Sequence, residues 1–144
     1  MSLNEMRANE MMAHLLDSLA AGEDIGHYGR LVVAMVGRHF AEDDAELIDV
    51  LAQSPGFGAE EAAALVEQVN ARGYNPPRRE RILEWQQRQD FPICPNAEDP
   101  RAGNVYRDLT FPNDVYQDIE EFHEDIAEAR AEDRVPSGGP ARRP

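Results

Sequence analysis

The chain has 144 residues, enough for one domain with a buried core, and carries 28 acidic residues against 14 arginines and no lysine, a net charge of −14. This charge argues against general binding to nucleic acid or to an anionic membrane, because such surfaces repel it, but it leaves room for one local basic patch. The one cysteine excludes an intramolecular disulfide and a four-cysteine zinc or iron–sulfur site within one chain.

No apolar run approaches the ~20 residues of a membrane span, and no basic-then-apolar leader opens the chain. We therefore expect a cytoplasmic protein that does not bind membranes. An acidic surface with arginine as its sole strong base is typical of a GC-rich genome and also of a salt-adapted host.

Apolar side chains recur at helical spacing and predict an all-α fold over residues 4–134, a single domain of about six helices. Residues with known capping preferences mark the ends: Asp24 and Asp43 or Asp44 at helix starts, Gly22 and Gly73 at helix ends. The expected helices span residues 4–21, 25–40, about 43–53, 59–72 and about 77–89, the last of these beginning at Pro76 and Pro77.

A proline-rich irregular loop is expected over residues 90–113, before a final helix that starts after Pro112 and Asn113. The apolar residues of this loop predict that it is ordered and covers the core, and residues 105–111 favour a short extended segment. Residues 135–144 have nothing to bury and predict a disordered tail.

The basic stretch of residues 72–90 holds five arginines and three acids, a local charge of +2 in an acidic chain. On the expected helix, Arg78, Arg81 and Arg88 share one face and could clamp phosphates near a positive helix N-terminus. Trp85 could stack on a base. The alternative is that these arginines pair with neighbouring carboxylates and that Trp85 belongs to the core.

Other candidates have weaker patterns. His27 and Arg30 could reach a phosphate from the start of the second helix, or Arg30 could pair with Glu23 or Asp24. Cys94 lies between prolines with no histidine beside it in the sequence, which favours a small buried hydrophobe over a nucleophile. The histidines lack paired ligand spacing, so we expect no metal, no cofactor and no enzymatic activity.

The final helix carries an apolar stripe whose members are spaced four, three and four residues apart. It either packs on the protein's own core or forms a coiled-coil seam with a protein partner. The second option would make the chain an acidic helical adaptor or scaffold with no nucleic-acid contact. The stripe consists of Val115, Ile119, Phe122 and Ile126.

Four pieces in order resemble the C-terminal domain of the archaeal and eukaryotic DNA primase large subunit, over about residues 11–96. They are "HLLDSLAAGEDIGHYGRLVVAMVGRHF", an acidic helix ending at "SPGF", "VEQVNARGYNPPRRERI" and "ICP". The resemblance includes a Gly-Glu turn leading to His-x-x-Arg and a later Tyr-x-Pro-Pro turn. It implies a helical replication protein that recognises a primer 5′ end on a template, with contributions from His27, Tyr28, Arg30 and Tyr74.

That family holds a [4Fe–4S] cluster through four cysteines, and only Cys94 stands at a matching place. Met11 and Met12 lie near the place of the first cysteine, and Arg78 and Arg79 follow the Tyr-x-Pro-Pro turn. One thiolate cannot ligate a cubane cluster. The resemblance therefore implies a cluster-free relative in which packing replaces the metal.

Overall fold

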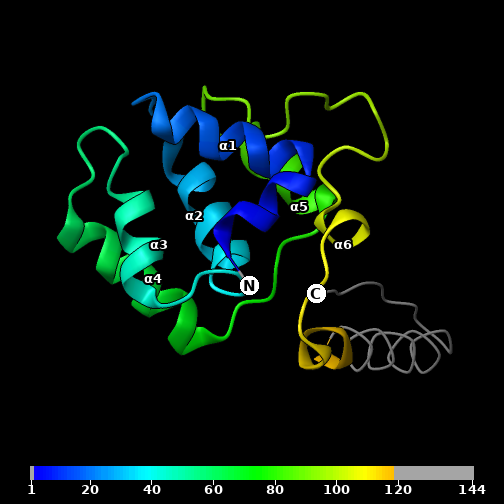
Figure 1. The fold of residues 1–144 in the computed structure, drawn as a ribbon. Coiled ribbons are helices and arrows are strands. Elements are labelled where there is room, and N and C mark those ends of the chain that lie inside the picture. Colours follow the sequence, from blue (N-terminus) through cyan, green and yellow to red (C-terminus); the bar gives the residue numbers. More distant parts are fainter. Residues whose placement is uncertain (1, 119–144) are drawn as a thin grey trace, which may run out of the picture. The chain divides into compact units, whose positions relative to one another are not determined.

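The computed structural model describes residues 2–118, and internal contacts divide the chain into two units, Met1–Thr110 and Phe111–Pro144. The described residues contain helices and no strand, which confirms the all-α class. None of their helices is long and apolar enough to cross a membrane. In unit 1 the elements are η1 (Leu3–Ala8, a 3₁₀ helix), α1 (Glu10–Ala20), α2 (Gly26–Gly37), α3 (Asp44–Leu51), α4 (Ala59–Arg72), α5 (Arg79–Gln86) and α6 (Val105–Asp108) (Figure 1).

Helix α2 is the centre of unit 1 and contacts α1, α3, α4 and α5. Its residues 32–37 are all buried, as expected for a helix that is apolar on every side. A Cβ on Gly37 would lie 2.7 Å from Cδ1 of Leu47, so glycine permits the close approach of α3. The predicted helix over residues 25–40 therefore forms, as Gly26–Gly37, and its apolar residues lie in the core.

The expected single helix over residues 4–21 is wrong, because the chain breaks at Asn9 into η1 and α1. Asn9 has an extended backbone, and its side-chain oxygen accepts a hydrogen bond from the Met12 amide at 3.0 Å, which caps α1. Its Nδ2 donates to Asp108 Oδ2 at 3.0 Å. Asn9 is 1 % exposed, so these bonds satisfy a buried amide that a continuous helix would leave unpaired.

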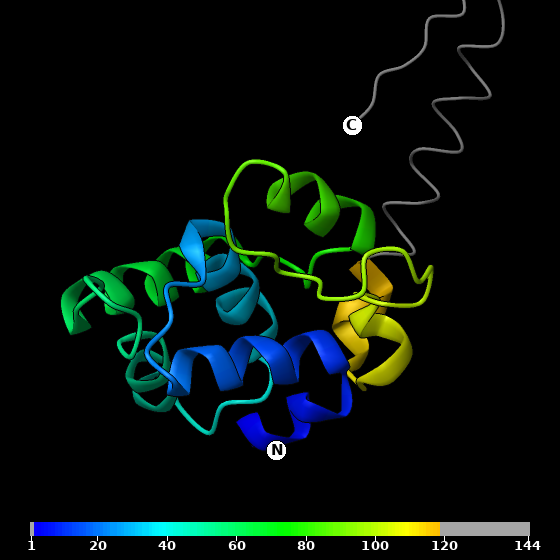
Figure 2. The same ribbon diagram turned by 90° about the horizontal axis from the view of Figure 1, so that it is seen from above.

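Helices α3 and α4 pack side by side at one end of unit 1, with α6 at the other end in both views (Figures 1 and 2). The Asp43 side chain accepts from the Glu46 amide at 2.9 Å and caps α3, as predicted. Helix α4 has the predicted bounds, and Gly73 ends it at φ 62° in the left-handed conformation.

Helix α5 begins at Arg79, two residues later than expected, with Arg78 as its N-cap and both prolines before it. The expectation of an extended segment over residues 105–111 is also wrong, since Val105–Asp108 is one helical turn. A helical turn pairs its own backbone groups, here Leu109 N–H with Val105 C=O at 3.0 Å, whereas an extended segment requires a partner strand. Val105 and Leu109 are both buried, one turn apart on the same side.

Unit 2 is described only from Phe111 to Asp118. It is helical over residues 113–118, which agrees with the expected start of the last helix. The Phe111 amide donates to the Tyr116 hydroxyl at 3.0 Å across this start. The remainder of the expected helix and the expected disordered tail, residues 135–144, lie outside the described residues, so the single domain over residues 4–134 stays a prediction.

Candidate nucleic-acid interface

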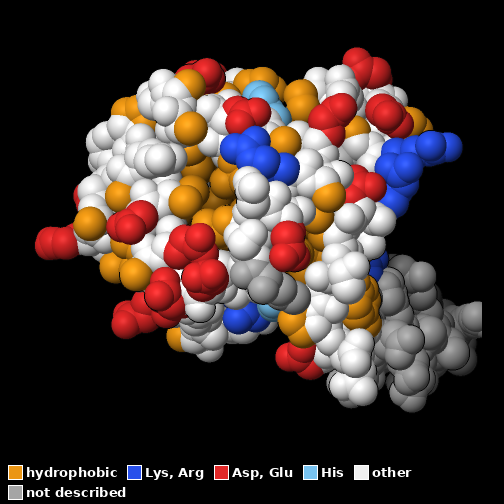
Figure 3. All heavy atoms as spheres, viewed as in Figure 1, with side chains coloured by type: hydrophobic (Ala, Val, Ile, Leu, Met, Phe, Trp, Pro, Cys, Tyr) orange, Lys and Arg blue, Asp and Glu red, His pale blue; other side chains and the backbone are white. Residues whose placement is uncertain are grey.

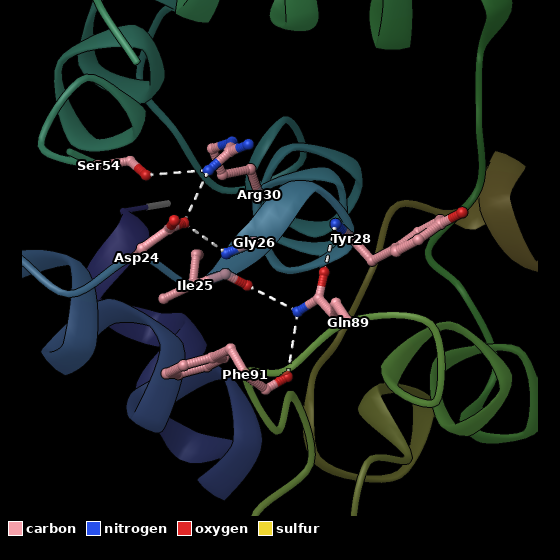
Figure 4. A network of polar contacts seen from close by, with 8 residues as sticks. All are labelled: Asp24, Ile25, Gly26, Tyr28, Arg30, Ser54, Gln89 and Phe91. Carbon is pink, nitrogen blue, oxygen red and sulfur yellow. Dashed lines mark hydrogen bonds and ion pairs between the residues drawn. The ribbon is translucent and has the colours of Figure 1, made fainter. Parts of the chain in front are cut away.

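The start of α2 is closed by side chains from two other segments (Figure 4). Asp24 Oδ1 accepts from the Gly26 amide at 2.9 Å, and Gln89 Oε1 accepts from the Tyr28 amide at 2.9 Å. Gln89 Nε2 donates to the carbonyls of Ile25 at 2.8 Å and Phe91 at 3.1 Å. Two amides that a phosphate would use are thus already paired, and the geometry does not support phosphate binding at this helix start.

Arg30 makes internal contacts. Its Nη1 donates to Ser54 Oγ at 3.1 Å and forms an ion pair with Asp24 Oδ1 at 3.3 Å, and its side chain is 16 % exposed. The guanidinium lies 4.4 Å from the centre of the Phe57 ring, a cation–π contact. The alternative that Arg30 pairs with Asp24 is therefore confirmed, and Arg30 holds α2 to the turn before α4.

Three candidate residues form a row of rings, which we call the aromatic row: His27, Tyr28 and Trp85. Tyr28 stacks on Trp85 with centroids 5.6 Å apart and an interplanar angle of 19°. His27 meets Tyr28 edge-on, with centroids 5.1 Å apart. His27 is exposed and the other two are half-buried, so Trp85 is only partly a core residue. The row joins the start of α2 to α5.

The residues Arg78, Arg81, Trp85 and Arg88, which we call the α5 stripe, are spaced three, four and three apart. Because α5 ends at Gln86, earlier than expected, only Arg81 and Trp85 share a face of it. Arg78 is the N-cap with an extended backbone, and Arg88 lies in the turn after the helix. All three arginines are exposed. Arg81 Nε lies 3.7 Å from Glu84 Oε1, with the two side chains 61 % and 60 % exposed. An ion pair this exposed contributes little to stability, so the alternative that the arginines are held in strong internal pairs does not apply to Arg81.

Arg79 faces the other way and is a structural residue. Its Nε donates to the Ala102 carbonyl at 2.8 Å and its Nη2 to the Ala97 carbonyl at 2.6 Å, and the residue is half-buried. It therefore ties the first turn of α5 to the proline-rich loop. Residue type alone does not separate Arg79 from its arginine neighbours by role, because all have the same chemistry.

Met11, Arg79 and Cys94 meet around Gly103. A Cβ on Gly103 would lie 3.4 Å from Cys94 Sγ, 3.5 Å from Arg79 Cγ and 3.8 Å from Met11 Sδ. Cys94 is 2 % exposed, and burial raises the pKa of its thiol above the ordinary value. The expected small buried hydrophobe is confirmed. One protonated thiol, a thioether and a guanidinium do not suit an iron–sulfur cluster.

Two further candidates, Tyr74 and the apolar stripe of the last helix, are not placed in a binding site by the described residues. Tyr74 is half-buried, and its carbonyl accepts from Arg38 Nε at 3.2 Å, while no ring contact joins it to the aromatic row among residues 2–118. Of the apolar stripe, Val115 is 2 % exposed and so is not accessible to a partner. Ile119, Phe122 and Ile126 lie outside the described residues. No three His, Cys, Asp or Glu side chains of residues 2–118 are grouped to hold a metal ion.

The sequence did not point to Gln89, because a glutamine after a helix has no signature and its partners are 61 and 64 positions away. On the face drawn in Figure 3, basic side chains lie in separate small groups among acidic and uncharged ones. Comparisons with protein-family models, curated proteins and solved structures found no match. Function is therefore inferred from the α5 stripe and the aromatic row.

Proposed function

We propose that this chain is a cluster-free relative of the C-terminal domain of the DNA primase large subunit, an accessory protein that binds a nucleic-acid backbone or 5′ end without acting on it chemically. The observation that carries the proposal is the α5 stripe, whose exposed Arg81 and Arg88 lie four residues before and three residues after Trp85. Arginine is suited to phosphate because its planar fork donates two parallel hydrogen bonds.

The local electrostatics favour this surface over the rest of the chain. Residues 72–90 carry five arginines and three acids, whereas the whole chain carries −14. Glu84 pairs with Arg81 at 3.7 Å, and both side chains are mostly solvated. Because such a pair is worth at most about 1 kcal/mol, a phosphate can replace Glu84 at little cost.

The surroundings of Gly103 support the relationship. Met11 lies near the place of the first cluster cysteine and Arg79 follows the Tyr-x-Pro-Pro turn, and both pack with Cys94, the one matching cysteine, around this glycine. In a cluster protein the metal cross-links such segments. Here the Arg79 guanidinium makes the cross-link, through its bonds to the carbonyls of Ala97 and Ala102.

The test is fluorescence-anisotropy binding to a primer–template with a 5′-triphosphate and to plain single strands, at low and moderate salt. The change is Arg81→Gln with Arg88→Gln, and the matched control is Arg101→Gln with Arg107→Gln, which removes the same charge from exposed arginines outside the stripe. We expect salt-sensitive binding whose log–log slope becomes shallower by about one unit per lost phosphate contact only in the stripe variant.

Absence of binding at low salt would refute the proposal, as would equal losses in the stripe variant and its control. The adaptor hypothesis would then lead, with a protein as the partner of this acidic chain. A preference for the triphosphate end would favour recognition of a 5′ end over recognition of the backbone.

A further inference from the structure

We propose that the nucleic acid bound here is single-stranded, and that an unpaired base stacks on the Trp85 indole while Arg81 and Arg88 hold the adjoining phosphates. This inference rests on the proposed function and names its ligand class. It is carried by the meeting of the α5 stripe with the aromatic row, which share Trp85.

The position of Trp85 within the stripe sets the geometry. Arg81 lies four residues before it, one turn away on α5. Arg88 lies three residues after it, in the turn that follows the helix, and its amide donates to the Trp85 carbonyl at 2.9 Å. Long arginine stems from these positions can reach the phosphates on both sides of one base.

Contacts within the protein hold the aromatic row together. Gln89 accepts the Tyr28 amide at 2.9 Å and follows Trp85 by four residues, so one side chain fixes the two segments that carry the stacked rings. The centroid distance of 5.6 Å and the angle of 19° are those of an offset stack. A base that adds to it does not have to order these rings first, which lowers the entropic cost of binding.

Charge favours a single strand over a duplex. A duplex hides its base faces and offers mainly phosphates, and the body of this chain, at −14, repels the rest of that backbone. An unpaired base adds stacking, which is worth about 5- to 150-fold in affinity per base. A surface with a few arginines and an aromatic row therefore binds most tightly to a ligand that offers both phosphates and unpaired bases.

Trp85 is the only tryptophan of the chain, so its fluorescence reports directly on this surface. The full chain is titrated with a single-stranded oligothymidylate, with a blunt duplex of equal length and with inorganic polyphosphate. We expect the single strand to bind more tightly than the duplex and to quench Trp85. Polyphosphate, which has no bases, should compete for the surface without this quenching.

Two variants separate stacking from charge. Trp85→Leu should lower single-strand affinity, measured by anisotropy, about tenfold or more and leave polyphosphate binding unchanged, and Trp85→Phe should lie between Leu and the native residue. The matched control is His14→Leu, which removes another stacked ring pair, His14 on Phe91 with centroids 5.2 Å apart, from outside the stripe.

Each result is decisive. Quenching by the single strand together with selective loss in Trp85→Leu supports the inference. Binding of single strand and duplex with equal affinity and no quenching overturns it, while the proposed function stands. No binding of any nucleic acid overturns both. If Trp85→Leu loses its helical circular dichroism, the Trp85→Phe variant and the quenching of the native chain decide.

Discussion

Replacing Arg79 with methionine tests whether this arginine substitutes for a metal as the link between α5 and the proline-rich loop. Methionine keeps the unbranched stem that packs near Gly103 and removes both hydrogen bonds, to Ala97 at 2.6 Å and Ala102 at 2.8 Å. A hydrogen bond to a charged group contributes about 1.5–3 kcal/mol. The two carbonyls belong to half-buried residues, so hydrogen bonds from water can replace part of the lost stabilisation. We therefore expect the free energy of unfolding to fall by ~2–4 kcal/mol.

The assay is urea unfolding followed by Trp85 fluorescence, which reports on unit 1. Arg101→Met is the control, because Arg101 is exposed on the same loop and its loss should change stability by less than about 0.5 kcal/mol. Arg79→Lys should lose part of this stability, because the lysine ammonium has no planar fork with which to bond both carbonyls. A loss below about 0.5 kcal/mol in Arg79→Met would refute the cross-linking role.

Two further predictions concern single positions. Gly26→Ala should destabilise the fold by ~2–4 kcal/mol, because φ is +79° and the new Cβ would lie 2.4 Å from Gln89 Oε1. The control is Gly22→Ala, at φ +77° with no atom within 4 Å of the new Cβ, which should lose only ~1–2 kcal/mol. Equal losses in the two variants would contradict the role of the Gln89 contact. Cys94 should react with iodoacetamide only on unfolding. Burial raises the pKa of the Cys94 thiol, so the stabilisation by the buried neutral thiol is complete below the ordinary thiol pKa and is lost as pH rises through the folded-state pKa. Urea unfolding midpoints of the native chain and of Cys94→Ala, from about pH 7 to 10, would measure this loss.

Local signals predicted much of the fold. Asp43 and Gly73 act through neighbours three or four positions away, so their roles follow from the nearby sequence. The break at Asn9 does not follow, because it depends on Asp108, 99 positions along the chain. The turn at residues 105–108 was missed for a related reason, since β-branched and aromatic residues favour a strand only where a partner strand is available.

The site divides in the same way. Helical periodicity predicted Arg78, Arg81 and Arg88 on one face of a helix over about 77–89, but α5 ends at Gln86 and begins after Arg78, so only Arg81 of the three lies within it. Periodicity did not say which face the loop would cover. The stack of Tyr28 on Trp85 depends on how α5 packs on α2, and no spacing rule links residues 57 positions apart.

The absence of a cluster can be tested on the native chain by measuring iron and acid-labile sulfide after anaerobic purification. Cys94 is buried, its thiol pKa is raised by that burial, and the Arg79 cation close to it disfavours a metal cation. We therefore expect iron well below one atom per chain, the same in Cys94→Ala as in the native protein. Iron and sulfide near four of each per chain, lost in Cys94→Ala, would contradict a cluster-free fold. The hydrogen bonds of Arg79 to Ala97 and Ala102 would then describe only the protein without its cluster.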